Sequence, residues 1–181
     1  MPIVIGAKSE SSFADPIGLL KDCHRRIERF MSVLTQVSGQ VSLTAGQRGS
    51  LETALRYFRE AAPAHTADEE ESLFPRLRSM ERGEVKAVLA KLDFLEDDHA
   101  RADTIHADVD RLGRIWLERG SLSNAESARF SELVAELVEL YSAHIAVEEH
   151  ELFPVAATVL EQPDRKAMGS EMAARRGVRN P

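Results

Sequence analysis

One chemically suggestive segment occurs twice in this sequence. Residues 65–75 read His-Thr-Ala-Asp-Glu-Glu-Glu-Ser-Leu-Phe-Pro, and residues 144–154 read His-Ile-Ala-Val-Glu-Glu-His-Glu-Leu-Phe-Pro. A histidine precedes a glutamate by four residues in each copy: His65 and Glu69, then His144 and Glu148. Four residues of an α-helix turn through about 400° and rise about 6 Å, so both side chains share one face. An imidazole and a carboxylate one turn apart form half of a metal site, and the sequence presents this half-site twice.

A weaker repeat precedes each copy. Residues 20–24, Leu-Lys-Asp-Cys-His, resemble residues 95–99, Leu-Glu-Asp-Asp-His, and each ends in a lone histidine, His24 or His99. The separations suit two antiparallel helices joined by a turn. Two such hairpins predict a four-helix bundle with pseudo-twofold symmetry and one ligand cluster at its centre.

The residue types indicate which metals this cluster would bind. A single histidine on an apolar helix face is usually a hydrogen-bonded core residue, and His–Glu salt bridges or solvated charges are further alternatives. Two glutamates aligned in one core would repel each other and would need a compensating cation. Imidazole and carboxylate donors without thiolate fit iron, manganese or zinc, and disfavour copper(I) or an iron–sulfur cluster. If Glu69 and Glu148 both bridge, each of two metals receives two imidazoles and two carboxylate oxygens, with room for a shared oxide or hydroxide and an open position.

Composition restricts the class of protein. The 181 residues, 43% hydrophobic and 29% charged, are typical of one soluble globular domain. No apolar run approaches the ~20 residues of a membrane span, and the first residues lack the pattern of a signal peptide. One cysteine excludes an internal disulfide, and a net charge of −7 disfavours nucleic-acid binding. We therefore expect a cytoplasmic protein that binds neither membranes nor nucleic acids.

Capping signals predict four helices. They cover residues 15–37, 44–78, 84–118 and 123–160, and they follow an irregular arm over residues 1–14. Thr44 with Gln47 and Ser123 with Glu126 have the spacing of capping boxes. Pro63 and Pro75 fall inside the second helix and should bend or locally unwind it.

The end of the chain is expected to lie outside the bundle. Residues 161–181 form a C-terminal tail in this interpretation, loosely ordered from residue 164. Its basic residues Arg175, Arg176 and Arg179 could touch an anionic partner, although a solvated end is the simpler interpretation.

The metal motifs resemble a known family. His24, His65-x-x-x-Glu69, His99 and His144-x-x-x-Glu148, with both Leu-Phe-Pro segments, resemble the hemerythrin-like domain, also called the HHE cation-binding domain, over about residues 15–160. The resemblance implies an all-α, up-down-up-down four-helix bundle that holds two iron ions bridged by Glu69 and Glu148. It also implies that His24 and His144 serve one iron, and His65 and His99 the other. Manganese and zinc are less favoured.

The ligand set separates this chain from oxygen carriers. Hemerythrins that carry oxygen use five histidines, one glutamate and one aspartate, whereas this chain matches with four histidines and two glutamates. This set is similar to bacterial proteins linked to repair of iron centres under nitrosative stress, and to peroxide-active and iron-sensing domains. Many repair proteins carry an N-terminal cysteine pair that this sequence does not contain, which argues against that role.

The expected function is binding or processing of dioxygen, nitric oxide or peroxide in stress response or sensing. Iron storage, donation or sensing, including repair of iron centres, is the alternative, and a structural metal such as zinc is a third. Whether the protein is an enzyme stays open, because turnover needs proton delivery as well as an open metal position.

Several other residues have two interpretations. His106 could be a fifth ligand, a partner of a ligand or an ordinary polar histidine, and Tyr141 could line the pocket, hydrogen-bond a bound oxygen ligand or simply pack. Cys23 is a buried apolar residue or a redox thiol. Glu28 and Asp103 could accept the outer ring N–H of a ligand histidine, or could be surface charges. The remaining candidates are expected to lie on the surface or off the ligand face: His150, Glu70, Glu71 and Glu149.

Overall fold

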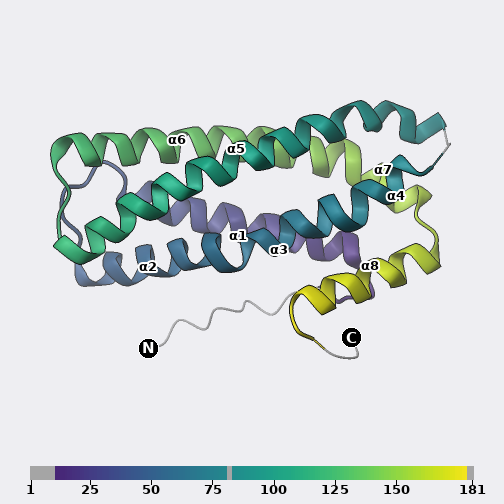
Figure 1. The fold of residues 1–181 in the computed structure, drawn as a ribbon, viewed down its shortest axis with the longest axis horizontal. Helices are drawn as coiled ribbons and strands as arrows, with labels where there is room; N and C mark the ends of the chain where they lie inside the picture. Colours follow the sequence, from purple (N-terminus) through teal and green to yellow (C-terminus); the bar gives the residue numbers. More distant parts are fainter. Residues whose placement is uncertain (1–10, 81–82, 179–181) are drawn as a thin grey trace.

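Four long helical rods lie side by side in the computed structural model, which describes residues 11–80 and 83–178 (Figure 1). The first rod is α1 (Pro16–Val37), and the third is α5 (Gly83–Arg119). The second rod comprises α2 (Ala45–Glu60), α3 (Ala62–Ala67), a π-helical turn η1 (Asp68–Leu73) and α4 (Phe74–Arg78). The fourth comprises α6 (Asn124–Val147), a π-helical turn η2 (Glu148–Leu152) and α7 (Phe153–Val159), and a further helix, α8 (Gln162–Arg175), follows. The predicted all-α bundle is confirmed.

The helices begin and end where the capping residues predict. The Asp15 carboxylate accepts a hydrogen bond from the backbone N–H of Gly18 at 3.0 Å, at the start of α1. Both capping boxes form, at Thr44 before α2 and at Ser123 before α6. Gly120, with a φ of 84°, follows the end of α5, because glycine adopts this left-handed conformation at low cost.

Proline distorts the second and fourth rods. The second rod breaks at Ala61, two residues before Pro63, which confirms the predicted bend. Pro75 and Pro154 each follow a π-helical turn, in which the N–H of Phe74 bonds to the carbonyl of Glu69 and the N–H of Phe153 to that of Glu148. Because proline has no N–H and crowds the carbonyl four residues earlier, the wider π turn relieves the conflict.

Two apolar clusters fill the bundle, with a polar layer between them. On α1, Leu20 belongs to one cluster and Ile27 to the other, and His24 lies between them. On α5, His99 lies in the same way between Leu95 and Ala102. The fold therefore places the predicted ligands in the interior and packs apolar side chains on both sides of them.

The loosely ordered tail predicted after residue 164 is wrong for the part that the structure describes. Helix α8 packs against α1 and the turn η1, and Met168 and Met172 are fully buried in the core. Gly169 permits α8 to lie close to the segment that precedes α1, since a Cβ there would lie 1.9 Å from the Phe13 carbonyl oxygen. Residues 1–10, most of the predicted arm, and Arg179 lie outside the described residues.

Candidate metal centre

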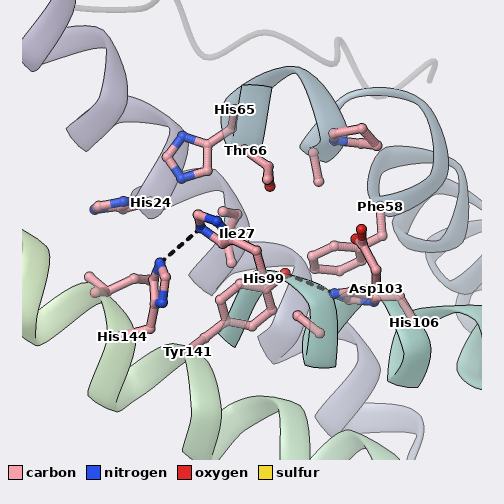
Figure 2. A pocket seen from close by; sticks show the side chains of 14 residues that line it. His24, Ile27, Phe58, His65, Thr66, His99, Asp103, His106, Tyr141 and His144 are labelled. Atoms are coloured by element: carbon pink, nitrogen blue, oxygen red, sulfur yellow. Dashed lines mark hydrogen bonds between the residues drawn. The ribbon is translucent and has the colours of Figure 1, made fainter. Parts of the chain in front are cut away.

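The six predicted ligands meet in the middle of the bundle. Figure 2 shows the four histidine rings turned toward a common point, from different helices. None of the four is more than 7% exposed, and both glutamates are fully buried. They come from six segments: His24 from α1, His65 from α3, Glu69 from η1, His99 from α5, His144 from α6 and Glu148 from η2.

The donor atoms form two groups of four that share both glutamates. One group contains His24 and His65, the other contains His99 and His144, and within each group the donor atoms lie within 4.8 Å of one another. The pairing inferred from the resemblance, His24 with His144 and His65 with His99, is therefore wrong. Each hairpin instead supplies one histidine pair, because the two helices of a hairpin are neighbours.

Glu69 faces both groups. Its Oε1 lies 3.5 Å from Nε2 of His65 and 3.9 Å from Nε2 of His24, whereas its Oε2 lies 3.3 Å from Nε2 of His99. One carboxylate oxygen thus points to each histidine pair, which is the arrangement a bridging ligand needs.

Glu148 also reaches both sides, through one oxygen. Its Oε2 lies 3.0 Å from Nε2 of His24 and 3.3 Å from Nε2 of His144. Together the two carboxylates connect the hairpins at the centre of the molecule.

The buried donor atoms fit a bound cation. Both oxygens of Glu69 and of Glu148, and Nε2 of His24, are buried without a hydrogen bond of good geometry. Buried polar atoms are almost always hydrogen-bonded, and two buried carboxylates repel unless positive charge compensates them. The arrangement is therefore suited to metal ions.

The two buried carboxylates attract positive charge strongly, as the pKa values of the neighbouring histidines show. Burial alone would lower the pKa of His24, but Glu148 and Glu69 outweigh it and raise the pKa to about 10. Burial also lowers the pKa of His99, and Glu69 raises it to about 9. A metal ion entering the centre must displace these protons, so metal binding should release protons.

The outer nitrogens of two histidines contact glutamates of the opposite hairpin. Nδ1 of His24 lies 2.9 Å from Oε1 of Glu149, and Nδ1 of His99 lies 2.8 Å from Oε1 of Glu70. Such contacts fix the ring orientation and make the inner nitrogen a better donor. Glu28 and Asp103, for which this role and that of a surface charge were both considered, are exposed.

Glu70 and Glu149 were expected to lie off the ligand face, and they do not face the centre, but they touch the ligand rings from outside. The sequence contained a signal for them, since each copy of the motif has a second glutamate directly after the bridging one. Consecutive residues are separated by a smaller angle in a π turn than in an α-helix, which brings the second glutamate toward the ligands.

Each Leu-Phe-Pro segment also supports a histidine of the opposite hairpin. Phe153 stacks on His24, with ring centroids 5.3 Å apart and planes at 12°. Phe74 lies parallel to His99, with centroids 6.3 Å apart and planes at 7°. The repeated motif therefore supplies a carboxylate shared by both donor groups, an outer carboxylate and an aromatic ring.

The two hairpins also differ in the residue that directly precedes His24 or His99. Nδ1 of His144 lies 3.4 Å from Oδ2 of Asp98, whereas the residue that corresponds to Asp98 in the first hairpin is Cys23. Cys23 is buried as expected, but it is not in apolar surroundings, because Nη2 of Arg26 donates to its sulfur at 3.0 Å. Burial alone would raise the pKa of the Cys23 thiol, but nearby His65 and Arg26 outweigh burial, so the pKa is lowered overall.

His106 and Tyr141 lie beside the centre rather than in it. His106 belongs to neither donor group, so the geometry does not support it as a fifth ligand. Its Nε2 is 2.9 Å from the Tyr141 hydroxyl, and both residues line a cavity of about 20 Å³ next to the four histidines (Figure 2). His150 is exposed, as predicted.

Comparisons with known proteins agree with this architecture. The family model described as "Hemerythrin HHE cation binding domain" matches residues 15–156. A protein of Haemophilus influenzae named "Uncharacterized protein" is 29% identical over 172 residues, which cover 93% of this chain and 94% of the relative. Over residues 11–80 and 83–178, no helix is both long and apolar enough to cross a bilayer. The family match covers more than half of the chain and includes both His-x-x-x-Glu motifs, so the chain belongs to the hemerythrin HHE cation-binding family.

Proposed function

We propose that this metal-binding protein holds two iron ions and uses them to bind or process a small oxidant ligand: dioxygen, nitric oxide or peroxide. The observation that carries the proposal is the pair of donor groups that share Glu69 and Glu148 beside a small cavity. The cavity, about 20 Å³, is large enough for about one water-sized molecule. A ligand of this size matches a diatomic gas or peroxide better than an organic substrate.

The donor set favours iron. In each group two imidazoles and two carboxylates would hold one metal, a combination that suits iron and resembles the carboxylate-bridged pairs of other helix bundles. His24 and His65 would hold one ion, His99 and His144 the other, and Glu69 and Glu148 would bridge them. Bound iron would supply electrons and an open coordination position.

The chain itself controls the surroundings of that position. Glu149 and Glu70 hold the rings of His24 and His99 in place, and the cavity wall combines polar groups with apolar side chains such as Ile27 and Ile145. Such a wall excludes bulk water and limits the size of the ligand. We place the role of the protein in oxidative or nitrosative stress response or sensing.

Metal analysis followed by spectroscopy tests the proposal. The purified protein should contain two iron ions per chain. Its ferrous form, prepared under anaerobic conditions, should change its visible spectrum when dioxygen, nitric oxide or hydrogen peroxide is then added. An iron-loaded protein whose spectrum responds to none of the three would contradict ligand binding.

Two substitutions test the assignment of the ligands. His24→Ala and Glu148→Ala should each lower the metal content, because each removes a donor. If Glu148→Ala retained two metals with unchanged affinity, Glu148 would not be a bridge.

Iron storage, donation or sensing, including repair of iron centres, is the alternative, and it requires iron that exchanges readily. The full burial of Glu69 and Glu148 disfavours fast exchange. Transfer of iron to an apo-protein acceptor within minutes, without a spectral response to oxidants, would support this alternative. Two zinc ions and no spectral response would instead indicate a structural metal.

A further inference from the structure

The central cavity is lined by the four predicted ligand histidines and also by a hydrogen-bonded pair, His106 and Tyr141. Nε2 of His106 lies 2.9 Å from the phenol oxygen of Tyr141. Phe58 stacks on the His106 ring, with centroids 4.2 Å apart and planes at 24°, and so holds its orientation. Figure 2 shows the Tyr141 ring between His144 and the Phe58–His106 stack.

Burial keeps both members of this pair uncharged. It lowers the pKa of His106 to about 4, so the imidazole is neutral near pH 7 and carries one ring proton. Burial also raises the pKa of the Tyr141 phenol, which therefore keeps its proton. When the ring proton of His106 is on Nε2, it is donated to the phenol oxygen, and the phenol O–H is then free to donate into the cavity.

One member of the pair, His106, also lines a cavity farther from the centre. A second, outer cavity of about 390 Å³ lies along α2, α3 and α5, and four residues line both cavities: Phe58, Pro63, Asp103 and His106. His106 therefore lies between the two cavities, and Tyr141 lines the inner one.

We propose that Tyr141, oriented by His106, donates a hydrogen bond to a small ligand in the central cavity, and that this bond favours ligands with a lone pair on the atom farthest from the metals. The inference rests on the proposed function, because the metal pair would hold the other end of the ligand. Anionic ligands of two or three atoms benefit most, because a hydrogen bond to a charged acceptor is the stronger kind.

Azide binding to the ferric, iron-loaded protein tests this role. Tyr141→Phe removes only the hydroxyl, and the Kd for azide should rise about tenfold while the iron content stays unchanged. The vibrational frequency of bound azide should shift in deuterated water in the wild-type protein, and this shift should vanish in Tyr141→Phe.

Variants of His106 provide an independent readout. His106→Leu should weaken azide binding in the same direction, because the phenol is no longer oriented, whereas His106→Gln should restore much of the affinity through its amide N–H. Tyr57→Phe is the matched control. Tyr57 lines a different cavity from Tyr141, and Tyr57→Phe keeps the ring that packs against Phe58, so the azide affinity of this variant should equal that of the wild type.

The outcomes separate the two proposals. Wild-type protein that contains iron but binds no azide would overturn the proposed function and, with it, this inference. Azide binding that is equal in wild type, Tyr141→Phe and His106→Leu, without a solvent isotope shift, would overturn the role of Tyr141 and leave the proposed function standing.

Discussion

Glu149 and Glu70 contribute to the centre without facing it. Each accepts from the outer nitrogen of a histidine on the opposite hairpin and is about one-third exposed, whereas the bridging glutamates are fully buried. A carboxylate at this position raises the basicity of the ring and fixes which nitrogen carries the proton. These residues should therefore tune metal affinity rather than determine whether metal binds.

Glu149→Ala should lower the metal affinity about tenfold to a hundredfold, because His24 loses its outer partner. Competition with a chelator of known affinity measures the change. Glu70→Ala should behave alike, since His99 occupies the equivalent position, and Glu139→Ala, on an exposed part of α6, is the control. Equal affinities for Glu149→Ala and the control would show that the contact is incidental.

His106 should make the metal-free protein sensitive to mild acid. Its pKa is lowered from 6.5 to about 4 by burial, so between these values the unfolded chain binds a proton that the folded chain does not. The free energy of unfolding should then fall as the pH falls through this range, by at most about 1.4 kcal/mol per pH unit from this group.

Urea unfolding of the metal-free wild type and His106→Gln at pH 7 and pH 5 measures this contribution. The variant should lose less stability than the wild type over that interval, since glutamine does not titrate. Identical losses would mean that His106 is as easily protonated in the folded chain as in the unfolded one.

The spacing of histidine and glutamate was sufficient to predict which six side chains meet. The four-residue spacing and the order of the motifs place the six side chains on the inner faces of four helical rods, and the structure brings them together there. The contacts of Glu70 and Glu149 could not be predicted in the same way, because regular α-helical angles would direct both side chains away from the ligands. Both residues lie in π turns, which alter those angles next to Pro75 and Pro154.

At the scale of elements, α8 holds the turn that carries Glu69. Asp68 is fully buried, and Arg175 and Arg176 contact its two oxygens at 2.9 Å and 2.6 Å. Arg175 also pairs with Glu71, and Arg76 with Glu171, so ion pairs flank the same contact. Arg175 and Arg176, two of the three basic residues that suggested an anionic partner, therefore have acidic partners within the chain.

The double variant Arg175→Ala/Arg176→Ala should lower the free energy of unfolding by about 3 kcal/mol, because it leaves the Asp68 carboxylate buried and unpaired. Chemical denaturation measures the loss. Adding Asp68→Asn should recover much of it, since a neutral amide is less costly to bury. Arg129→Ala is the control, because Arg129 pairs with Glu132 on the exposed surface, and its effect should stay within about 0.5 kcal/mol. A loss no larger than that of the control would show that α8 does not depend on these ion pairs.

Helix α8 also shows a limit of predicting elements from composition. The basic residues suggested a chain end outside the bundle, yet Met168 and Met172, four residues apart, form an apolar stripe that packs on the core. A stripe this short does not distinguish a docked helix from a solvated one, because its partner surface on α1 and η1 exists only in the folded bundle.

At the scale of the whole molecule, the centre joins two hairpins, and it lies between two apolar clusters to which both hairpins contribute. Metal bound by both hairpins stabilises only the folded state, because the donors are dispersed in the unfolded chain. Ligation should thus contribute strongly to the stability of the bundle.

Removal of the metal with a chelator should lower the unfolding midpoint, and re-addition of ferrous iron under anaerobic conditions should restore it. At a free metal concentration of a hundred times Kd, the gain is about 2.7 kcal/mol per site. The double variant Glu69→Ala/Glu148→Ala should no longer respond to iron. A metal-dependent shift in that variant equal to the wild type would place the metal elsewhere.

Each hairpin supplies the outer carboxylate and the stacked phenylalanine for a histidine of the other hairpin, His24 or His99. This exchange has a consequence for how such a centre can be assembled. Two identical copies of one hairpin, placed around a twofold axis, would already supply bridging carboxylates, outer carboxylates and stacked phenylalanines. Joining the copies in one polypeptide frees each from having to match the other. Cys23 and Asp98 are one pair of corresponding residues that differ between the two hairpins. This difference gives the two cation positions different neighbours.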